Sequence, residues 1–73
     1  MPLIQVKVIE GVFSKEQKQD IVRKLTDTMV AIEGENLRGA TMVLIEDVLS
    51  GDWGIGGKPL TTADAKALAA GKK

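Results

Sequence analysis

Two runs of β-branched residues lie on either side of one long stretch with helical spacing, and this pattern most constrains the fold. The first run, residues 3–9, has the sequence LIQVKVI, a composition that is typical of a strand. The second, residues 41–45, is almost uninterrupted apolar sequence, which is typical of a strand in a parallel sheet. Strand, helix and strand in this order predict a βαβ unit with a right-handed crossover.

The stretch between the two strands predicts one helix over residues 15–33. Ser14 and Gln17 match a capping box, in which the serine hydroxyl and the glutamine side chain bond the backbone at the helix start. Gly34 fits a helix C-cap. The apolar residues follow helical spacing and predict one stripe along the helix. The predicted stripe consists of Ile21, Val22, Leu25, Met29 and Ile32.

One helix can cover only one face of a two-stranded sheet. The other face keeps one of two apolar pairs, either Met42 and Leu44 or Val43 and Ile45, and the pattern leaves open which. The chain is small, 44% hydrophobic and free of cysteine, and small domains of this kind often gain stability by oligomerising. A second copy of the chain is the simplest cover for the open face, so we expect a homo-oligomer.

The C-terminal part of the sequence predicts short elements. Four glycines between residues 51 and 57 favour tight turns and a short hairpin. Thr61 and Asp64 have the spacing of a second capping box, and Gly71 fits a helix stop, so residues 60–73 are expected to form a short helix and tail. Since neither a repeat nor a linker interrupts the chain, we expect a single domain over residues 1–73.

Charge and composition exclude several classes of function. Ten basic and ten acidic residues cancel, which favours neither nucleic acid nor an acidic membrane surface as a partner. The apolar runs are too short for a membrane span or a signal peptide, so we expect a cytoplasmic protein. The sequence has no cysteine and no histidine, which removes thiolate nucleophiles, zinc sites of the usual kind and imidazole. We expect neither a metal nor a cofactor.

Pro2 has two interpretations. Proline lacks a backbone N–H and is tolerated at the first residue of a strand, which is a purely structural role. If Met1 is removed, however, Pro2 carries a secondary amine that is fixed to the backbone. An α-amino group ordinarily has a pKa of about 7.7–8, and burial in an apolar pocket lowers it further. No other group in the chain has an ordinary pKa so near neutrality.

Several features, taken in order, resemble the 4-oxalocrotonate tautomerase family of the tautomerase superfamily. Pro2 opens the first strand, Glu10-Gly11 closes it, Ser14 to Lys18 open the helix, and WGIGG follows the second strand at 53–57. The match is strongest over residues 2–57. None of these features is diagnostic alone, but their order and separation are specific.

The resemblance implies an α/β fold, with a βαβ protomer that ends in a C-terminal β-hairpin and assembles into dimers and commonly a hexamer. It also implies an enol–keto tautomerase that acts on a small carbonyl or enol substrate, with Pro2 as general base and acid. In the family, the backbone N–H at the position of Ile9 binds oxygen through water. Trp53 corresponds to an aromatic pocket residue, although a lone tryptophan also packs well in an interface.

Two positions depart from the family. Its typical members carry two arginines that hold the substrate's oxygens, whereas this chain has Val12 and Met42 at those positions. An atypical, more apolar pocket is therefore expected, one that favours neutral or monoanionic substrates. Arg38 is the preferred replacement cation, because guanidinium binds carboxylate in a bidentate manner; Lys7 and Lys58 are weaker candidates. For all three, a solvated surface charge is the alternative. A non-catalytic oligomer that binds a small apolar ligand or partner is the alternative function.

Overall fold

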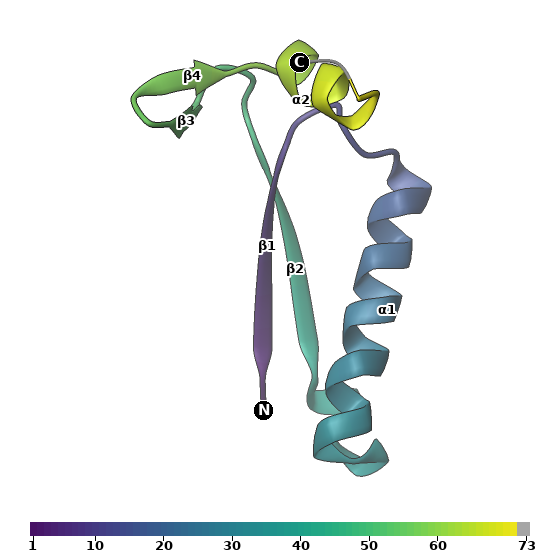
Figure 1. The fold of residues 1–73 in the computed structure, drawn as a ribbon. Coiled ribbons are helices and arrows are strands. Elements are labelled where there is room, and N and C mark those ends of the chain that lie inside the picture. The colour runs from purple at the N-terminus through teal and green to yellow at the C-terminus, as the bar shows by residue number, and fades with distance from the viewer. Residues whose placement is uncertain (72–73) are drawn as a thin grey trace. The chain divides into compact units, whose positions relative to one another are not determined.

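The computed structural model describes residues 1–71 and confirms a βαβ arrangement followed by a hairpin and a short helix (Figure 1). The elements are β1 (Leu3–Ile9), α1 (Lys15–Glu33), the 3-10 helix η1 (Glu35–Ala40), β2 (Met42–Val48), β3 (Trp53–Ile55), β4 (Lys58–Leu60) and α2 (Thr62–Ala69). The tail expected at residues 72 and 73 lies outside the described residues.

The described chain divides into two compact units. The first contains Met1–Val6 and Ser14–Glu46, and the second contains Lys7–Phe13 and the residues from Asp47 onward. The expectation of a single domain over residues 1–73 stays a prediction.

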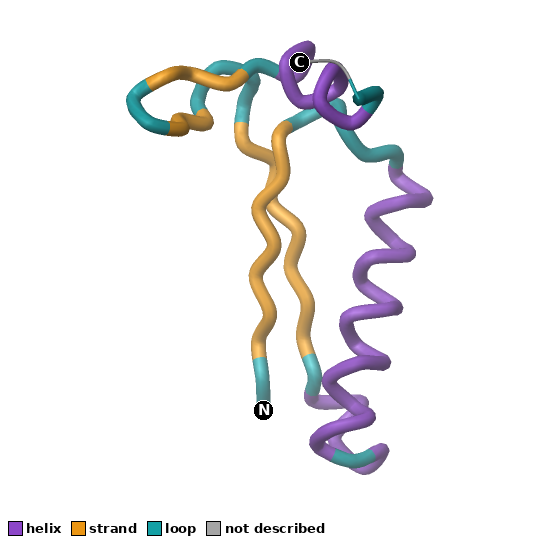
Figure 2. The backbone as a smooth tube through the Cα atoms, in the orientation of Figure 1, coloured by secondary structure: helices purple, strands orange, loops and turns teal. Residues whose placement is uncertain are grey.

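β1 and β2 form a two-stranded parallel sheet (Figure 2). At one end the Met42 N–H donates to the Pro2 carbonyl over 3.1 Å, and at the other the Glu10 N–H donates to the Val48 carbonyl over 2.9 Å. Since both strands advance in the same direction between these two bonds, the pairing is parallel. A parallel pair needs a long crossover, and α1 with η1 supplies it.

α1 begins and ends at the residues that the sequence predicts. The Ser14 hydroxyl accepts the Gln17 N–H over 3.1 Å, and the Gln17 side chain accepts the Ser14 N–H over 2.8 Å, which completes the capping box. At the other end, Gly34 has a φ of 107° and donates its N–H to the Val30 carbonyl. The chain then enters η1, which contacts α1 and which the sequence did not predict.

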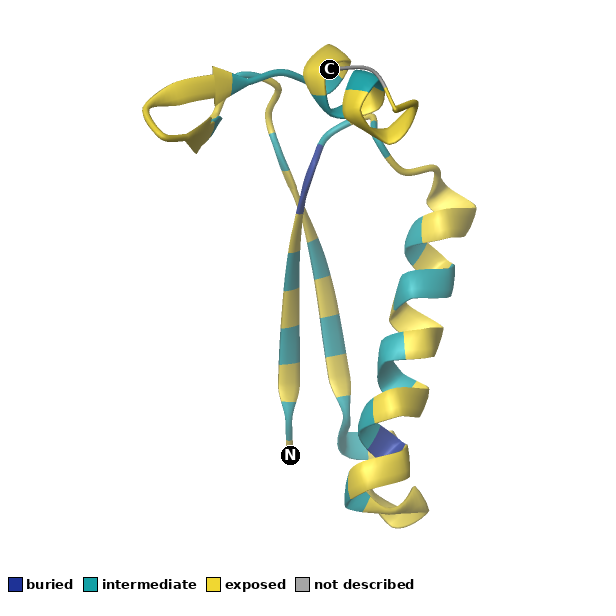
Figure 3. Cartoon of the chain, viewed as in Figure 1, coloured by how far each residue is buried: buried dark blue, intermediate teal, exposed yellow. Residues whose placement is uncertain are grey.

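The first unit shows which face of the sheet is covered. Burial alternates along residues 3–7 of β1 and 42–46 of β2, as Figure 3 shows. In β2, Val43 and Ile45 are half-buried, whereas Met42 is 49% exposed and Leu44 48% exposed. In β1, Leu3 is 50% exposed. The apolar pair on the open face is therefore Met42 and Leu44, and Leu3 of the neighbouring strand extends it.

The predicted stripe of α1 needs two corrections. Ile21, Leu25 and Met29 are half-buried as expected, but Val22 is exposed at 37%. Ile32 is 81% exposed, whereas Val30 is buried at 6% exposure. Each residue advances about 100° around an α-helix, so Val30 and Ile32 lie about 200° apart and cannot both be covered on one side. Of the two, the covered side chain is that of Val30.

The second unit contains the predicted hairpin. β3 and β4 pair antiparallel, with Trp53 opposite Leu60. Gly56 and Gly57, with φ of 58° and 84°, occupy the turn between them. A tight hairpin turn of type I′ requires positive φ at both central residues, which explains the two glycines.

α2 follows the hairpin and begins with the predicted capping box. The Thr61 hydroxyl accepts the Asp64 N–H, and the Asp64 carboxylate accepts the Thr61 N–H over 3.0 Å. These bonds to Thr61 hold the pKa of Asp64 below its usual value, because they stabilise the ionised carboxylate. Among residues 1–71, no helix has the length and apolar character that crossing a membrane would need.

Two truncations can test whether Val30, and not Ile32, is the covered side chain of α1. Val30→Ala should lower the free energy of unfolding by about 1–2 kcal/mol, because it removes buried methyl groups. Ile32→Ala should change it by less than about 0.5 kcal/mol, as is usual at exposed positions. Urea unfolding followed by circular dichroism measures both. A larger loss for Ile32→Ala would contradict the placement of Val30 as the covered side chain.

Candidate active site

Pro2 lies immediately before β1 and is half-buried. Its carbonyl accepts the Met42 N–H over 3.1 Å, the bond that begins the pairing of the two strands. The structure therefore brings together two of the residues that the sequence singles out, both in the first unit. Because the backbone at Pro2 is held by a strand pair and the side chain is a ring, the nitrogen of this residue has little freedom of its own.

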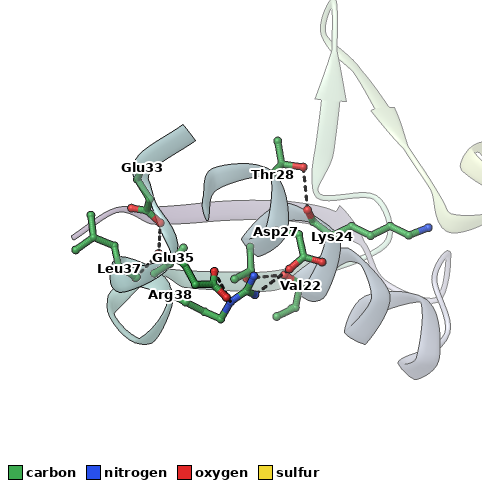
Figure 4. Close-up of polar contacts among 10 residues, drawn as sticks. Val22, Lys24, Asp27, Thr28, Glu33, Glu35, Leu37 and Arg38 are labelled. Carbon is green, nitrogen blue, oxygen red and sulfur yellow. Dashed lines mark hydrogen bonds and ion pairs between the residues drawn. The ribbon is translucent and has the colours of Figure 1, made fainter. Parts of the chain in front are cut away.

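Arg38 lies in η1, where two carboxylates of the same chain hold its guanidinium (Figure 4). Its Nε donates to both Glu35 carboxylate oxygens, over 3.0 and 3.1 Å, and its Nη1 donates to Asp27 Oδ1 over 2.8 Å. The Glu35 and Asp27 carboxylates hold the pKa of Arg38 above its usual value. An external anion would have to compete with both of them for this side chain.

The second unit contains the turn after β1, with Ile9 and Val12. Ile9 is buried, and its carbonyl accepts the Val12 N–H over 3.4 Å. Gly11 has a φ of 78°, and a Cβ at this position would lie 3.2 Å from Thr62 Cγ2. Both observations favour glycine here, because positive φ and close approach penalise other residues.

Glu10 connects this turn to two other segments of the second unit. Its carboxylate accepts the Ser50 N–H over 3.2 Å, and its carbonyl accepts the Thr62 hydroxyl over 2.7 Å. Ser50 in turn accepts the Thr62 N–H at its hydroxyl over 2.9 Å. These bonds fix the turn that contains Val12 against the start of α2. In the sequence Glu10 is only a turn signal, and no local pattern indicates its bonds to Ser50 and Thr62.

Trp53, the aromatic candidate, opens β3 and is half-buried. Its strand partner is Leu60. The candidate residues thus fall into two sets: Pro2, Arg38 and Met42 in the first unit, and Ile9, Val12 and Trp53 in the second. Residues 1–71 contain no group of three or more acidic, histidine or cysteine side chains placed to hold a metal ion.

Comparison with known proteins decides the family. The family model described as "Tautomerase enzyme" matches residues 2–63. The chain belongs to the tautomerase family. The matched region begins at Pro2 and extends a few residues beyond the 2–57 that the sequence motifs cover, through the hairpin and into the first residues of α2.

Relatives and solved structures agree with this assignment. A probable tautomerase of Ralstonia nicotianae is 40% identical over 63 residues, which cover 86% of this chain and 87% of that protein. A probable tautomerase of Dickeya dadantii is 31% identical over 61 residues, or 84% and 90% of the two chains.

Among solved structures, apo unfused 4-OT superposes with a TM-score of 0.72 at 33% identity, covering 81% of this chain and 93% of that one. A 4-oxalocrotonate tautomerase isozyme structure from Methylibium petroleiphilum gives a TM-score of 0.68 at 37% identity, with coverage of 92% and 97%. The predicted 4-oxalocrotonate tautomerase resemblance is therefore confirmed.

Competition between an external anion and the two carboxylates that hold Arg38 can be tested without an activity assay. Titration with acetate should shift the Arg38 Nε–H signal in nuclear magnetic resonance only weakly, because Glu35 and Asp27 occupy the guanidinium. The double variant Asp27→Asn, Glu35→Gln should give a saturable shift at lower acetate concentration, since both competitors lose their charge.

Arg23, which pairs with Asp20 over 2.7 Å, provides the internal control. Its signal should respond equally in both proteins, because neither substitution alters that pair. Acetate binding to Arg38 of equal strength in the unmodified chain and the double variant would show that the two carboxylates do not compete.

Proposed function

We propose that this protein is an enol–keto tautomerase, and therefore an isomerase, in which the amine of Pro2 transfers the proton after Met1 is removed. The observation that carries this proposal is the tautomerase family match that begins at Pro2. The position of Pro2 supports it, since a half-buried ring held at the start of a strand is a base with few degrees of freedom. While Met1 is attached, the same nitrogen is an amide and has no basic lone pair.

The proposed reaction is balanced and needs no further reactant. The secondary amine of Pro2 accepts the hydroxyl proton of the enol, and the oxygen electron pair forms the carbonyl. The electron pair of the C=C bond takes a proton from the Pro2 ammonium at carbon, which restores the free amine. One group that accepts and returns a proton near neutral pH is sufficient for this chemistry.

The other candidate residues have proposed roles in binding the substrate. The Ile9 N–H serves as a donor to a substrate oxygen through water, and Trp53 forms an apolar wall of the pocket. Val12 and Met42 occupy the positions where typical members have arginine, so this pocket lacks two charged donors. Arg38 remains the candidate cation for a single carboxylate, in competition with Glu35 and Asp27.

Because Val12 and Met42 are apolar, the enzyme should prefer substrates with one carboxylate over matched substrates with two. Burying an unpaired carboxylate costs several kcal/mol, which corresponds to a ratio in kcat/KM of about 10²-fold or more. The enol of phenylpyruvate and the enol of 4-carboxyphenylpyruvate form a matched pair, and loss of enol absorbance measures both rates.

The assay uses protein whose free Pro2 amine is confirmed by intact mass, and Pro2→Ala is the control with a primary amine at the same place. Equal or better turnover of the dicarboxylate would show that another cation serves the pocket. No turnover of either enol by protein with a free Pro2 amine would refute the tautomerase proposal and favour a non-catalytic oligomer of this fold.

We also propose that the protein acts as a homo-oligomer. In residues 1–71 only Val8, Ile9 and Val30 are buried hydrophobic residues, which is a thin core for a stable domain without cross-links. The open sheet face contains three large apolar side chains at about half exposure, Leu3, Met42 and Leu44. A second copy would cover this face and supply the missing apolar burial.

Sedimentation velocity at micromolar concentration should therefore show a species larger than the 7.8 kDa protomer. Leu44→Lys places a charge on the open face and should shift the protein toward the protomer, because an unpaired charge opposes burial. Leu68→Lys, at a residue of α2 that is 61% exposed, is the matched control and should sediment like the unmodified chain. A folded, stable protomer of the unmodified chain would refute the proposal.

A further inference from the structure

Thr41, the last residue before β2, is held by three polar contacts within the first unit. Its hydroxyl donates to the Leu37 carbonyl over 2.8 Å and also contacts the Glu33 carboxylate at the end of α1. Its backbone N–H donates to the Arg38 carbonyl over 3.2 Å. Thr41 is half-buried, as is Glu33, so water competes only in part for these contacts.

The next peptide group in the chain is the one that reaches Pro2. Thr41 and Met42 share a planar peptide unit, whose N–H is the donor to the Pro2 carbonyl over 3.1 Å. The contacts of Thr41 therefore fix the orientation of the donor that holds Pro2. Through Thr41, the end of α1 is connected to Pro2 by a continuous series of polar contacts.

The 3-10 helix η1, which supports Thr41, is itself held in place. η1 supplies the Leu37 and Arg38 carbonyls, and the Arg38 side chain connects η1 to Asp27 of α1 (Figure 4). Each exposed ion pair contributes little stability alone. Together with the backbone bonds, however, they give Thr41 a defined support rather than a free loop.

We propose that Thr41 is a positioning residue for Pro2, acting through the Met42 N–H. The proposal rests on the proposed function of Pro2. In the processed chain the Pro2 nitrogen belongs to the ring, and rotation about the Cα–C bond is the one soft dihedral between it and the carbonyl. A carbonyl held by a fixed donor therefore gives the ring nitrogen a reproducible direction. Loss of the hydroxyl loosens that donor and lets the nitrogen leave its productive place.

Loss of the Thr41 hydroxyl should lower kcat and leave KM unchanged, because Thr41 is proposed to orient the base and not to bind the substrate. A misplacement of about 1 Å can cost about 10²-fold in rate, so Thr41→Val should lower kcat by about 10- to 100-fold. KM for the enol of phenylpyruvate should stay within about twofold of its value in the unmodified chain, since the contacts that bind the substrate are unchanged. Thr41→Ser retains the hydroxyl and should retain kcat.

Thr28→Val is the matched control. The Thr28 hydroxyl donates to the Lys24 carbonyl over 2.9 Å on the exposed surface of α1, so the substitution removes the same group from the same unit (Figure 4). This variant should keep both kcat and KM. Circular dichroism under the assay conditions shows that each variant is folded, and rates are expressed per folded protein.

Hydrogen exchange of the Met42 amide provides a readout that needs no activity. In Thr41→Val its protection should fall by about fivefold, the factor that corresponds to the net contribution of one hydrogen bond. Amides in the middle of α1 should keep their protection in the same variant, as all amides should in Thr41→Ser.

The proposal is overturned if folded Thr41→Val keeps its kcat, if Thr41→Ser loses as much as Thr41→Val, or if Met42 exchange does not change. If unmodified protein with a free Pro2 amine proves inactive, the proposed function fails, and Met42 exchange still decides whether Thr41 holds the Pro2 contact.

Discussion

The parallel pairing of β1 with β2 is the constraint on which the rest of the first unit depends. Since both strands run in the same direction, the chain must return along the whole strand before it can pair again. The 7 residues of β1 span about 23 Å, and the 19 residues of α1 span about 28 Å, so the helix is longer than the strand that it accompanies. Its last turn extends past the start of β1 in Figure 1. Here the chain reverses through Gly34 and η1.

This excess length explains why the last turn of α1 differs from the rest of the helix. Earlier in α1, Ile21, Leu25 and Met29 are half-buried at the spacing of the helical period. In the last turn η1 is the neighbouring element, and the covered residue is Val30 rather than Ile32. The periodic pattern predicted Ile21, Leu25 and Met29 correctly and Val22 and Ile32 wrongly. A periodic pattern assumes one flat neighbour along the whole helix, and this assumption fails at Ile32, in the last turn.

The features that the sequence predicted correctly are those set by short-range physics. Ser14 with Gln17, Thr61 with Asp64, and the paired glycines of the hairpin all act within a few residues, and each is present as expected. The features that it missed depend on contacts between elements. Arg38 reaches Asp27 across η1 and α1, and only the Glu35–Arg38 spacing gives a local hint of this cluster. Thr41 looked like the first residue of a strand, and its three contacts became visible only in three dimensions.

Because the core of the described chain is thin, polar contacts near Pro2 are important for holding the start of β1 in place. None of the three buried hydrophobic residues of the described chain, Val8, Ile9 and Val30, lies at the start of β1. The Met42 N–H bond and the contacts of Thr41 hold it from one side. Met42, the donor of this hydrogen bond, and Leu3, which follows the acceptor Pro2, are also half-exposed residues of the open sheet face. A second copy bound to that face would also help to hold the hydrogen bond between Met42 and Pro2. Assembly and the positioning of Pro2 would then act on one hydrogen bond, which would couple the oligomeric state to the rate of proton transfer.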